Sequence, residues 1–177
     1  MTQNVEPVVT DQADEWIDRF DGKLVLVLLD NKRAPSLKGG RSLWALHDPL
    51  TYRPGDRTEN ITVRPGFPTD LASIPRWAWI ILPPDGPWVK AAIIHDYLYA
   101  TSGTGVWKDG PSGITRSTPY SRLEADRILR EAMANRGVPF LRRAIIYTAV
   151  RLGGARGWGQ EDQIERRLAA DVSTAIE

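Results

Sequence analysis

The chain contains no cysteine, and this absence removes several classes of chemistry at once. Disulfide bonds, cysteine-ligated zinc, iron–sulfur clusters and thiol nucleophiles all need that side chain. The absence of cysteine does not indicate the redox state of the compartment in which the protein works, because a protein without thiols tolerates oxidising and reducing surroundings alike. With 177 residues the chain has the length of one compact domain, which buries enough surface at this size to fold without crosslinks.

Long hydrophobic runs and an excess of one charge are missing as well. The longest apolar runs, Leu24–Leu29 and Trp77–Leu82, are far shorter than the ~20 residues of a membrane span. The polar, acidic N-terminal stretch differs from a signal peptide. With 23 basic and 22 acidic residues the net charge is +1, which is too balanced to indicate either nucleic acid or a membrane as the partner. We therefore expect a soluble globular protein without a transmembrane segment.

The first half of the chain is rich in strand and turn signals. Leu24–Leu29 predicts a buried strand, and Ser42–Leu46 and Asn60–Arg64 predict two more. In the last of these, Ile61 and Val63 alternate with polar residues, so one face is expected to be buried. The stretch TYRPGDRTEN between the second and third strands is typical of a turn.

The second half changes to helical periodicity. Trp88–Ala100 predicts a helix that is apolar nearly all round and hence buried. Ser121–Asn135 predicts a second helix, with Ser121 as its N-cap and Glu124 completing a capping box. A third helix is expected over residues 139–152, and a fourth from residue 160 to the C-terminus.

Together these patterns predict an α+β fold, in which a small N-terminal antiparallel sheet is followed by a helical subdomain of about four helices. We expect residues 1–22 to form an N-terminal arm and residues 23–177 a single domain. Within that domain, residues 23–66 are β-rich, residues 67–87 form a proline-rich connector and residues 88–177 are helical.

Ionisable residues occupy helix positions that the apolar pattern marks as buried. Asp126 lies on the apolar stripe of the second helix, and His95 lies on that of the first. A buried carboxylate needs a partner, and Asp126 could accept the imidazole N–H of His95, which would fix the tautomer and raise its basicity. Asp96 follows His95 directly. Asp70 lies in a proline-bounded loop before the first helix, as a functional residue or as the cap of a short turn.

Four segments resemble, in order, a bacteriophage and prophage family known as domain of unknown function 1353. They are GFPTDLASIPR, AAIIHDYLY, EADRILREAM and YTAVRLGGARGW, within about Ser42 to Trp158. The resemblance implies a phage or prophage origin and leaves the activity open. It also implies synthesis in the cytoplasm of a host bacterium, with possible incorporation into the phage particle.

A second, local likeness concerns chemistry. The string HDxxY (His95, Asp96, Tyr99), followed by Asp126 on a later helix, is similar to the core of secreted phospholipase A2. The likeness implies that His95 is the general base that activates water, that Asp126 and Tyr99 orient it, and that Asp96 binds calcium. The disulfide framework and the glycine-rich calcium loop of those enzymes have no counterpart in this sequence.

Two functions stay open. The first is a phage-encoded hydrolase that acts on an ester or amide of the host envelope, with His95, Asp126 and Tyr99 as its catalytic residues. A divalent cation, calcium or magnesium, could be held by Asp96 and Asp70, because carboxylate oxygens suit these ions. The second is a non-enzymatic virion, tail or accessory protein that acts through protein or nucleic-acid contacts. In that case the pair of His95 and Asp126 is structural.

The second function would depend on surfaces. Trp107 lies in a loop with no apolar neighbour in sequence except Val106, so it is a candidate contact for a substrate, a lipid surface or a protein. Residues 136–167 carry seven arginines against three acidic residues, a charge of +4 that could contact phosphates. The tryptophans near the connector, Trp77, Trp79 and Trp88, are expected to pack in the core or against the connector, and His47 is expected at the surface or partly buried.

Overall fold

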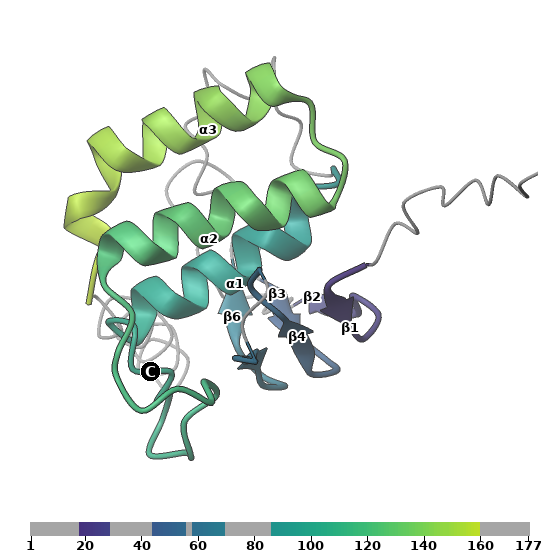
Figure 1. Cartoon of the computed structure of the whole chain (residues 1–177). Helices are drawn as coiled ribbons and strands as arrows, with labels where there is room; N and C mark the ends of the chain where they lie inside the picture. The colour runs from purple at the N-terminus through teal and green to yellow at the C-terminus, as the bar shows by residue number, and fades with distance from the viewer. Residues whose placement is uncertain (1–17, 29–43, 56–57, 70–85, 160–177) are drawn as a thin grey trace, which may run out of the picture.

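The computed structural model describes residues 18–28, 44–55, 58–69 and 86–159 (Figure 1). Within these ranges six short strands come first and three helices follow. They are β1 (Phe20–Asp21), β2 (Leu26–Leu28), β3 (Trp44–Leu46), β4 (Leu50–Tyr52), β5 (Ile61–Val63), β6 (Pro68–Thr69), α1 (Val89–Ala100), α2 (Arg122–Asn135) and α3 (Phe140–Gly153), with the 3₁₀ turn η2 (Gly154–Gly157) after α3. No helix in the described part of the chain is long and apolar enough to cross a membrane.

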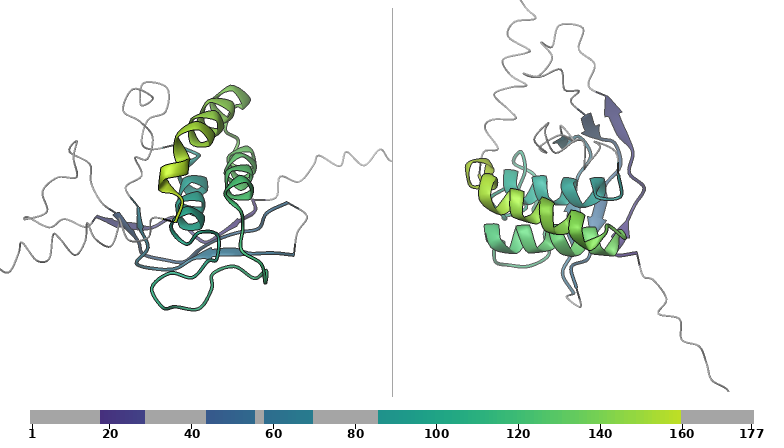
Figure 2. Two further views of the ribbon diagram at one scale, coloured as in Figure 1. Left: turned by 90° about the vertical axis from the view of Figure 1, so that its left-hand side faces the viewer. Right: turned by 90° about the horizontal axis from the view of Figure 1, so that it is seen from above.

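The helices are stacked on two small sheets. The strand orders are β1-β4-β5 and β2-β3-β6, and every pairing is antiparallel. α1 packs on β4 and β5 and against α2, and α3 packs on α2 on the side away from the sheets (Figures 1 and 2). The class is therefore mixed α and β, as predicted, but with two sheets where one was expected. The predicted fourth helix lies outside the described residues, and β1 falls in the residues assigned to the arm.

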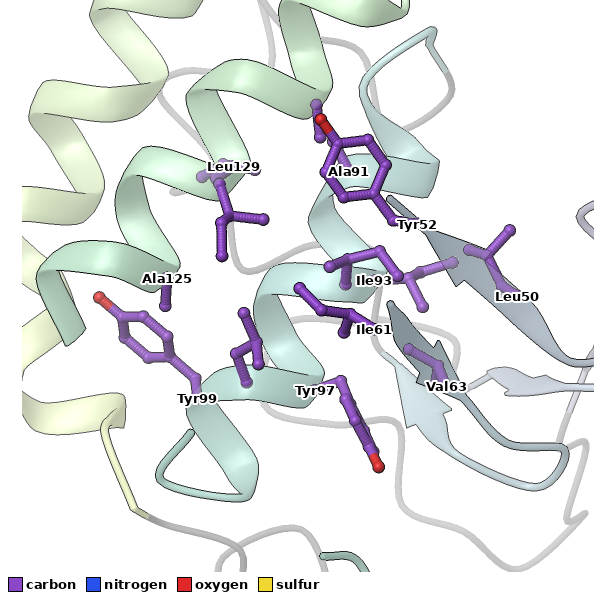
Figure 3. Packing of buried hydrophobic residues seen from close by; sticks show 14 of the residues in the cluster. Leu50, Tyr52, Ile61, Val63, Ala91, Ile93, Tyr97, Tyr99, Ala125 and Leu129 are labelled. Atoms are coloured by element: carbon purple, nitrogen blue, oxygen red, sulfur yellow. The ribbon is translucent and has the colours of Figure 1, made fainter. Parts of the chain in front are cut away.

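α1 is the centre of the core, as its apolar sequence predicts. Eight of its twelve residues are buried, because the helix has the sheet on one side and α2 on the other. Figure 3 shows the two directions: the Tyr97 ring points away from α2, and the Tyr99 ring points toward Ala125 of α2. Each fully buried large apolar side chain stabilises the fold by about 1.5–3 kcal/mol. The position of α1 is therefore strongly fixed.

α2 begins with the predicted capping box. The Ser121 hydroxyl accepts from the Glu124 amide, and the Glu124 carboxylate accepts from the Ser121 amide. The hydrogen bond from the Ser121 backbone is the largest cause that lowers the pKa of Glu124 to about 2, and Arg116 adds an ion pair at 3.0 Å. The start of α2, and with it the rotation of the helix about its axis, is thus fixed locally.

Two strand predictions need correction. Leu24–Leu29 was expected to be a buried strand, but β2 is an edge strand among those described, and Val27 and Leu28 are exposed. Part of the stretch taken as a turn, Thr51 and Tyr52, completes β4, where Tyr52 is buried in the core and its hydroxyl donates to the Glu131 carboxylate. The alternation in β5 is confirmed, with Ile61 and Val63 buried.

The expectations for the tryptophans and for His47 can be compared with the structure in part. Trp107 is partly buried and packs edge-to-face on Phe67, with ring centroids 5.5 Å apart, so it has an apolar neighbour in space, and its role as a contact residue stays a prediction. Phe67 lies 40 positions away in the sequence, beyond the reach of local pattern. Trp88 is in the core and His47 is exposed, as expected. Trp77 and Trp79 lie outside the described residues.

Candidate functional site

One buried carboxylate, that of Asp126 on α2, is the centre of the site. It is fully buried and has three donors. His95 Nε2 lies 3.0 Å from Oδ1, and the Tyr99 hydroxyl donates to the same oxygen at 2.7 Å. Arg151 Nη1 donates to Oδ2 at 2.6 Å. A carboxylate with three donors from α1 and α3 is well compensated, which is what allows it to be buried.

Helical spacing explains how α1 supplies two of these donors. His95 and Tyr99 are four residues apart and therefore project from one side of the helix. The centroids of the two rings lie 4.1 Å apart, and the ring planes are tilted by 38° relative to each other. Asp126 lies on the buried stripe of α2, which faces α1. The contact between His95 and Asp126 that the sequence predicts is therefore present, and Tyr99 joins it.

The site favours an ionised Asp126 and a more basic His95. Burial by itself raises the pKa of Asp126, but the hydrogen bonds from His95, Arg151 and Tyr99 outweigh burial and lower it. Burial likewise disfavours the charged His95, but its hydrogen bonds and charge interactions with Asp126 and Asp96 outweigh burial and raise its pKa. The Tyr99 pKa is raised by burial and by Asp126, so this hydroxyl stays protonated and acts as a donor.

The tautomer of His95 follows from its partner. Ionised Asp126 can only accept, so Nε2 carries the hydrogen and the neutral ring presents a lone pair on Nδ1. On that side lies Asp96, whose Oδ1 is 3.9 Å from Nδ1 and whose side chain is 22% exposed. The Thr69 hydroxyl donates to the other Asp96 oxygen at 3.4 Å. The proton-accepting nitrogen of His95 is therefore next to a partly exposed carboxylate.

Arg151 was not predicted as a site residue. It was counted with the surface arginines, yet it binds the carboxylate at the centre of the site. Arg122, at the start of α2, donates to the Arg151 backbone carbonyl at 3.4 Å. Arg151 lies in the YTAVRLGGARGW segment, but nothing in this segment distinguishes it from the other arginines of the second half.

The glycine-rich turn after α3 encloses Tyr99. Trp158 packs edge-to-face on the Tyr99 ring, with centroids 5.1 Å apart, and the Gly159 amide donates to the Tyr99 carbonyl. A Cβ atom on Gly154 would lie 2.7 Å from the Tyr99 hydroxyl oxygen, closer than such atoms approach. The absence of a side chain at Gly154 is thus a condition for the hydrogen bond from Tyr99 to Asp126.

This contact gives a prediction with a built-in control. We expect Gly154→Ala to lower the free energy of unfolding by about 1–2 kcal/mol, because the new methyl must displace the Tyr99 hydroxyl. Gly153→Ala has nothing within 4 Å of its Cβ and should be neutral or slightly stabilising. Urea denaturation of the two variants measures the difference. Equal effects would show that Tyr99 does not depend on the glycine.

The predicted cation ligands are only partly described. Asp96 lies beside His95, whereas Asp70 lies outside the described residues. Within the described ranges no three His, Asp or Glu side chains are grouped so that they could hold a metal ion. A calcium or magnesium ion at Asp96 and Asp70 stays a prediction.

The family comparison covers most of this site. A family described as "Protein of unknown function (DUF1353)" matches residues 44–150, more than half of the 177 residues. The chain belongs to this family. No curated protein and no solved structure matches it. In this DUF1353 protein the matched region includes His95, Tyr99 and Asp126 and ends one residue before Arg151.

Proposed function

We propose that this DUF1353 protein is a hydrolase in which His95, held by Asp126, activates a water molecule for attack on an ester or amide. One observation carries the proposal. The buried Asp126 carboxylate lies 3.0 Å from His95 Nε2, and the second ring nitrogen, Nδ1, lies 3.9 Å from the partly exposed carboxylate of Asp96. A purely structural pair needs only the first contact.

The proposed reaction uses the residues as follows. Nδ1 of His95 takes a proton from water while the water oxygen attacks the carbonyl carbon, and the imidazolium then gives that proton to the leaving group. Asp126 stabilises the imidazolium that forms and fixes its orientation, as the carboxylate of a catalytic triad does. Tyr99 and Arg151 hold Asp126 in place and are positioning residues. No step passes through a metal.

The substrate class follows from the phage resemblance. We place it among the esters and amides of a bacterial envelope, which a phage enzyme would cleave during entry or release. Secreted phospholipase A2 uses a similar HDxxY string, which supports ester hydrolysis as the first reaction to test.

The test is hydrolysis of p-nitrophenyl esters and of fluorogenic peptide amides by the full chain. We expect His95→Asn to lower the rate about 10²–10⁴-fold, which is the usual contribution of a general base. The wild-type rate should rise with pH through a pKa above 6.5, because only neutral His95 accepts a proton. Assays with EDTA and with added calcium test the predicted cation.

His47→Asn is the matched control, because His47 is the only other histidine and is exposed. It should keep the wild-type rate. If neither probe class is hydrolysed, or if both histidine variants lose activity equally, the hydrolase is rejected and the pair of His95 and Asp126 is structural.

A further inference from the structure

α3 is the least buried helix in the described part of the chain. It lies farthest from the sheets (Figure 2) and has one buried residue, Ile146. The three most exposed large apolar side chains of the described residues belong to it: Phe140 at 65%, Leu141 at 70% and Leu152 at 82%. This degree of apolar exposure on one helix marks an interaction surface.

The exposed residues of α3 are regularly spaced. Leu141, Ile145, Thr148 and Leu152 follow one another at intervals of four, three and four residues, which places them along one side of the helix. Leu141, Thr148 and Leu152 are exposed, and Ile145 is partly buried. We call these four residues the α3 stripe. α2 contacts the opposite side of the helix, around Ile146, so the stripe faces outward.

The surroundings of the α3 stripe are strongly basic. Residues 136–156 contain five arginines and no acidic residue, although the whole chain has a net charge of only +1. Arg136 and Arg151 bind carboxylates of the protein itself. Arg142 and Arg156 are exposed and have no carboxylate partner within the described ranges, whereas Arg143 is partly buried and lies on the side of the helix that carries Ile146. Two exposed cations therefore accompany the apolar stripe.

We propose that the α3 stripe, with Arg142 and Arg156, binds an anionic lipid surface. An amphipathic helix with apolar side chains on one face and arginines beside them lies in the headgroup region, where the apolar residues enter the acyl boundary and the cations meet anionic headgroups. Nucleic acid would use the arginines but would leave Leu141 and Leu152 in water. The lipid proposal uses both features and does not depend on catalysis at His95.

The test is flotation of the full-length protein with vesicles. We expect binding to phosphatidylglycerol vesicles and little binding to phosphatidylcholine vesicles. Arg142→Glu with Arg156→Glu should lower the affinity at least twentyfold, since each cation near such a surface contributes about fivefold. Leu141→Gln with Leu152→Gln should lower binding to the same vesicles without unfolding the protein, because both side chains are exposed.

Matched controls lie on other elements. Lys23→Glu changes an exposed cation, and Val27→Gln with Val106→Gln changes two exposed apolar residues, and neither should affect vesicle binding. The proposal is overturned if wild type ignores anionic vesicles, if the controls lose as much affinity as the α3 variants, or if a duplex oligonucleotide binds and vesicles do not. It is also overturned if the leucine variants turn a dimer into a monomer, or lose stability, without any vesicle binding. Those outcomes would show that the α3 stripe is covered by a second copy of the chain or by another part of the same chain, and not by lipid.

Discussion

Replacing Asp126 by alanine is expected to lower the free energy of unfolding by about 3–5 kcal/mol, the cost of removing one member of a buried charged group. The carboxylate is fully buried, and its removal leaves three donors without their acceptor. His95→Ala should cost less, because Tyr99 and Arg151 still donate to Asp126. Urea denaturation monitored by circular dichroism measures both losses.

Two further variants make this expectation specific. Asp126→Asn keeps the shape and one accepting oxygen but turns an NH₂ group toward a donor, so its loss should lie between those of wild type and Asp126→Ala. Asp48→Ala removes an exposed carboxylate and should change stability by less than about 0.5 kcal/mol. A loss below about 1 kcal/mol for Asp126→Ala would contradict the central position given to this carboxylate.

The stability of the wild-type protein is expected to fall as pH rises above about 6.5. The pKa of His95 is raised in the folded state, so its contribution is fully present below the unfolded-state value of 6.5. Above that pH the folded state alone keeps the proton, and stability falls by up to about 1.4 kcal/mol per pH unit until the pH has passed the folded-state pKa. Urea midpoints between pH 6 and 9 measure this fall.

Variants of the two histidines distinguish the pH dependence caused by His95 from that caused by other groups. His95→Asn should remove the decline between pH 6.5 and 9, whereas His47→Asn should keep it, because the His47 ring is largely in solvent. A wild-type midpoint that stays constant over this range would show that His95 is not more basic in the folded protein. The Asp126→Asn variant should also show a weaker decline, since it removes the main partner of His95.

The sequence predicts those parts of the protein that depend on local spacing. The capping box of α2, the burial of α1 and the contact between His95 and Asp126 all follow from periodicity over one or two helical turns. Tyr99 was indicated by the likeness to the HDxxY string, and the structure adds its hydrogen bond to Asp126.

Features that depend on long-range packing were missed. Arg151 reaches Asp126 across 25 positions, and nothing near it in sequence distinguishes it from a surface arginine. β2 has the composition of a central strand but lies at the edge of its sheet among the described strands, because strand order is not encoded in the strand itself. Trp107 finds its neighbour Phe67 through tertiary folding alone.

The weak burial of α3 has a consequence for the lifetime of the site. Protein segments with few buried apolar contacts open more readily than the core and do so without global unfolding. α3 has a single buried residue, whereas α1 has eight, yet α3 supplies one of the three donors to Asp126. Local opening of α3 would withdraw Arg151 while α1, α2 and the sheets stay folded. The time for which the complete constellation persists is therefore set by the fluctuations of its outermost helix, and anything that holds α3 in place also holds the site together.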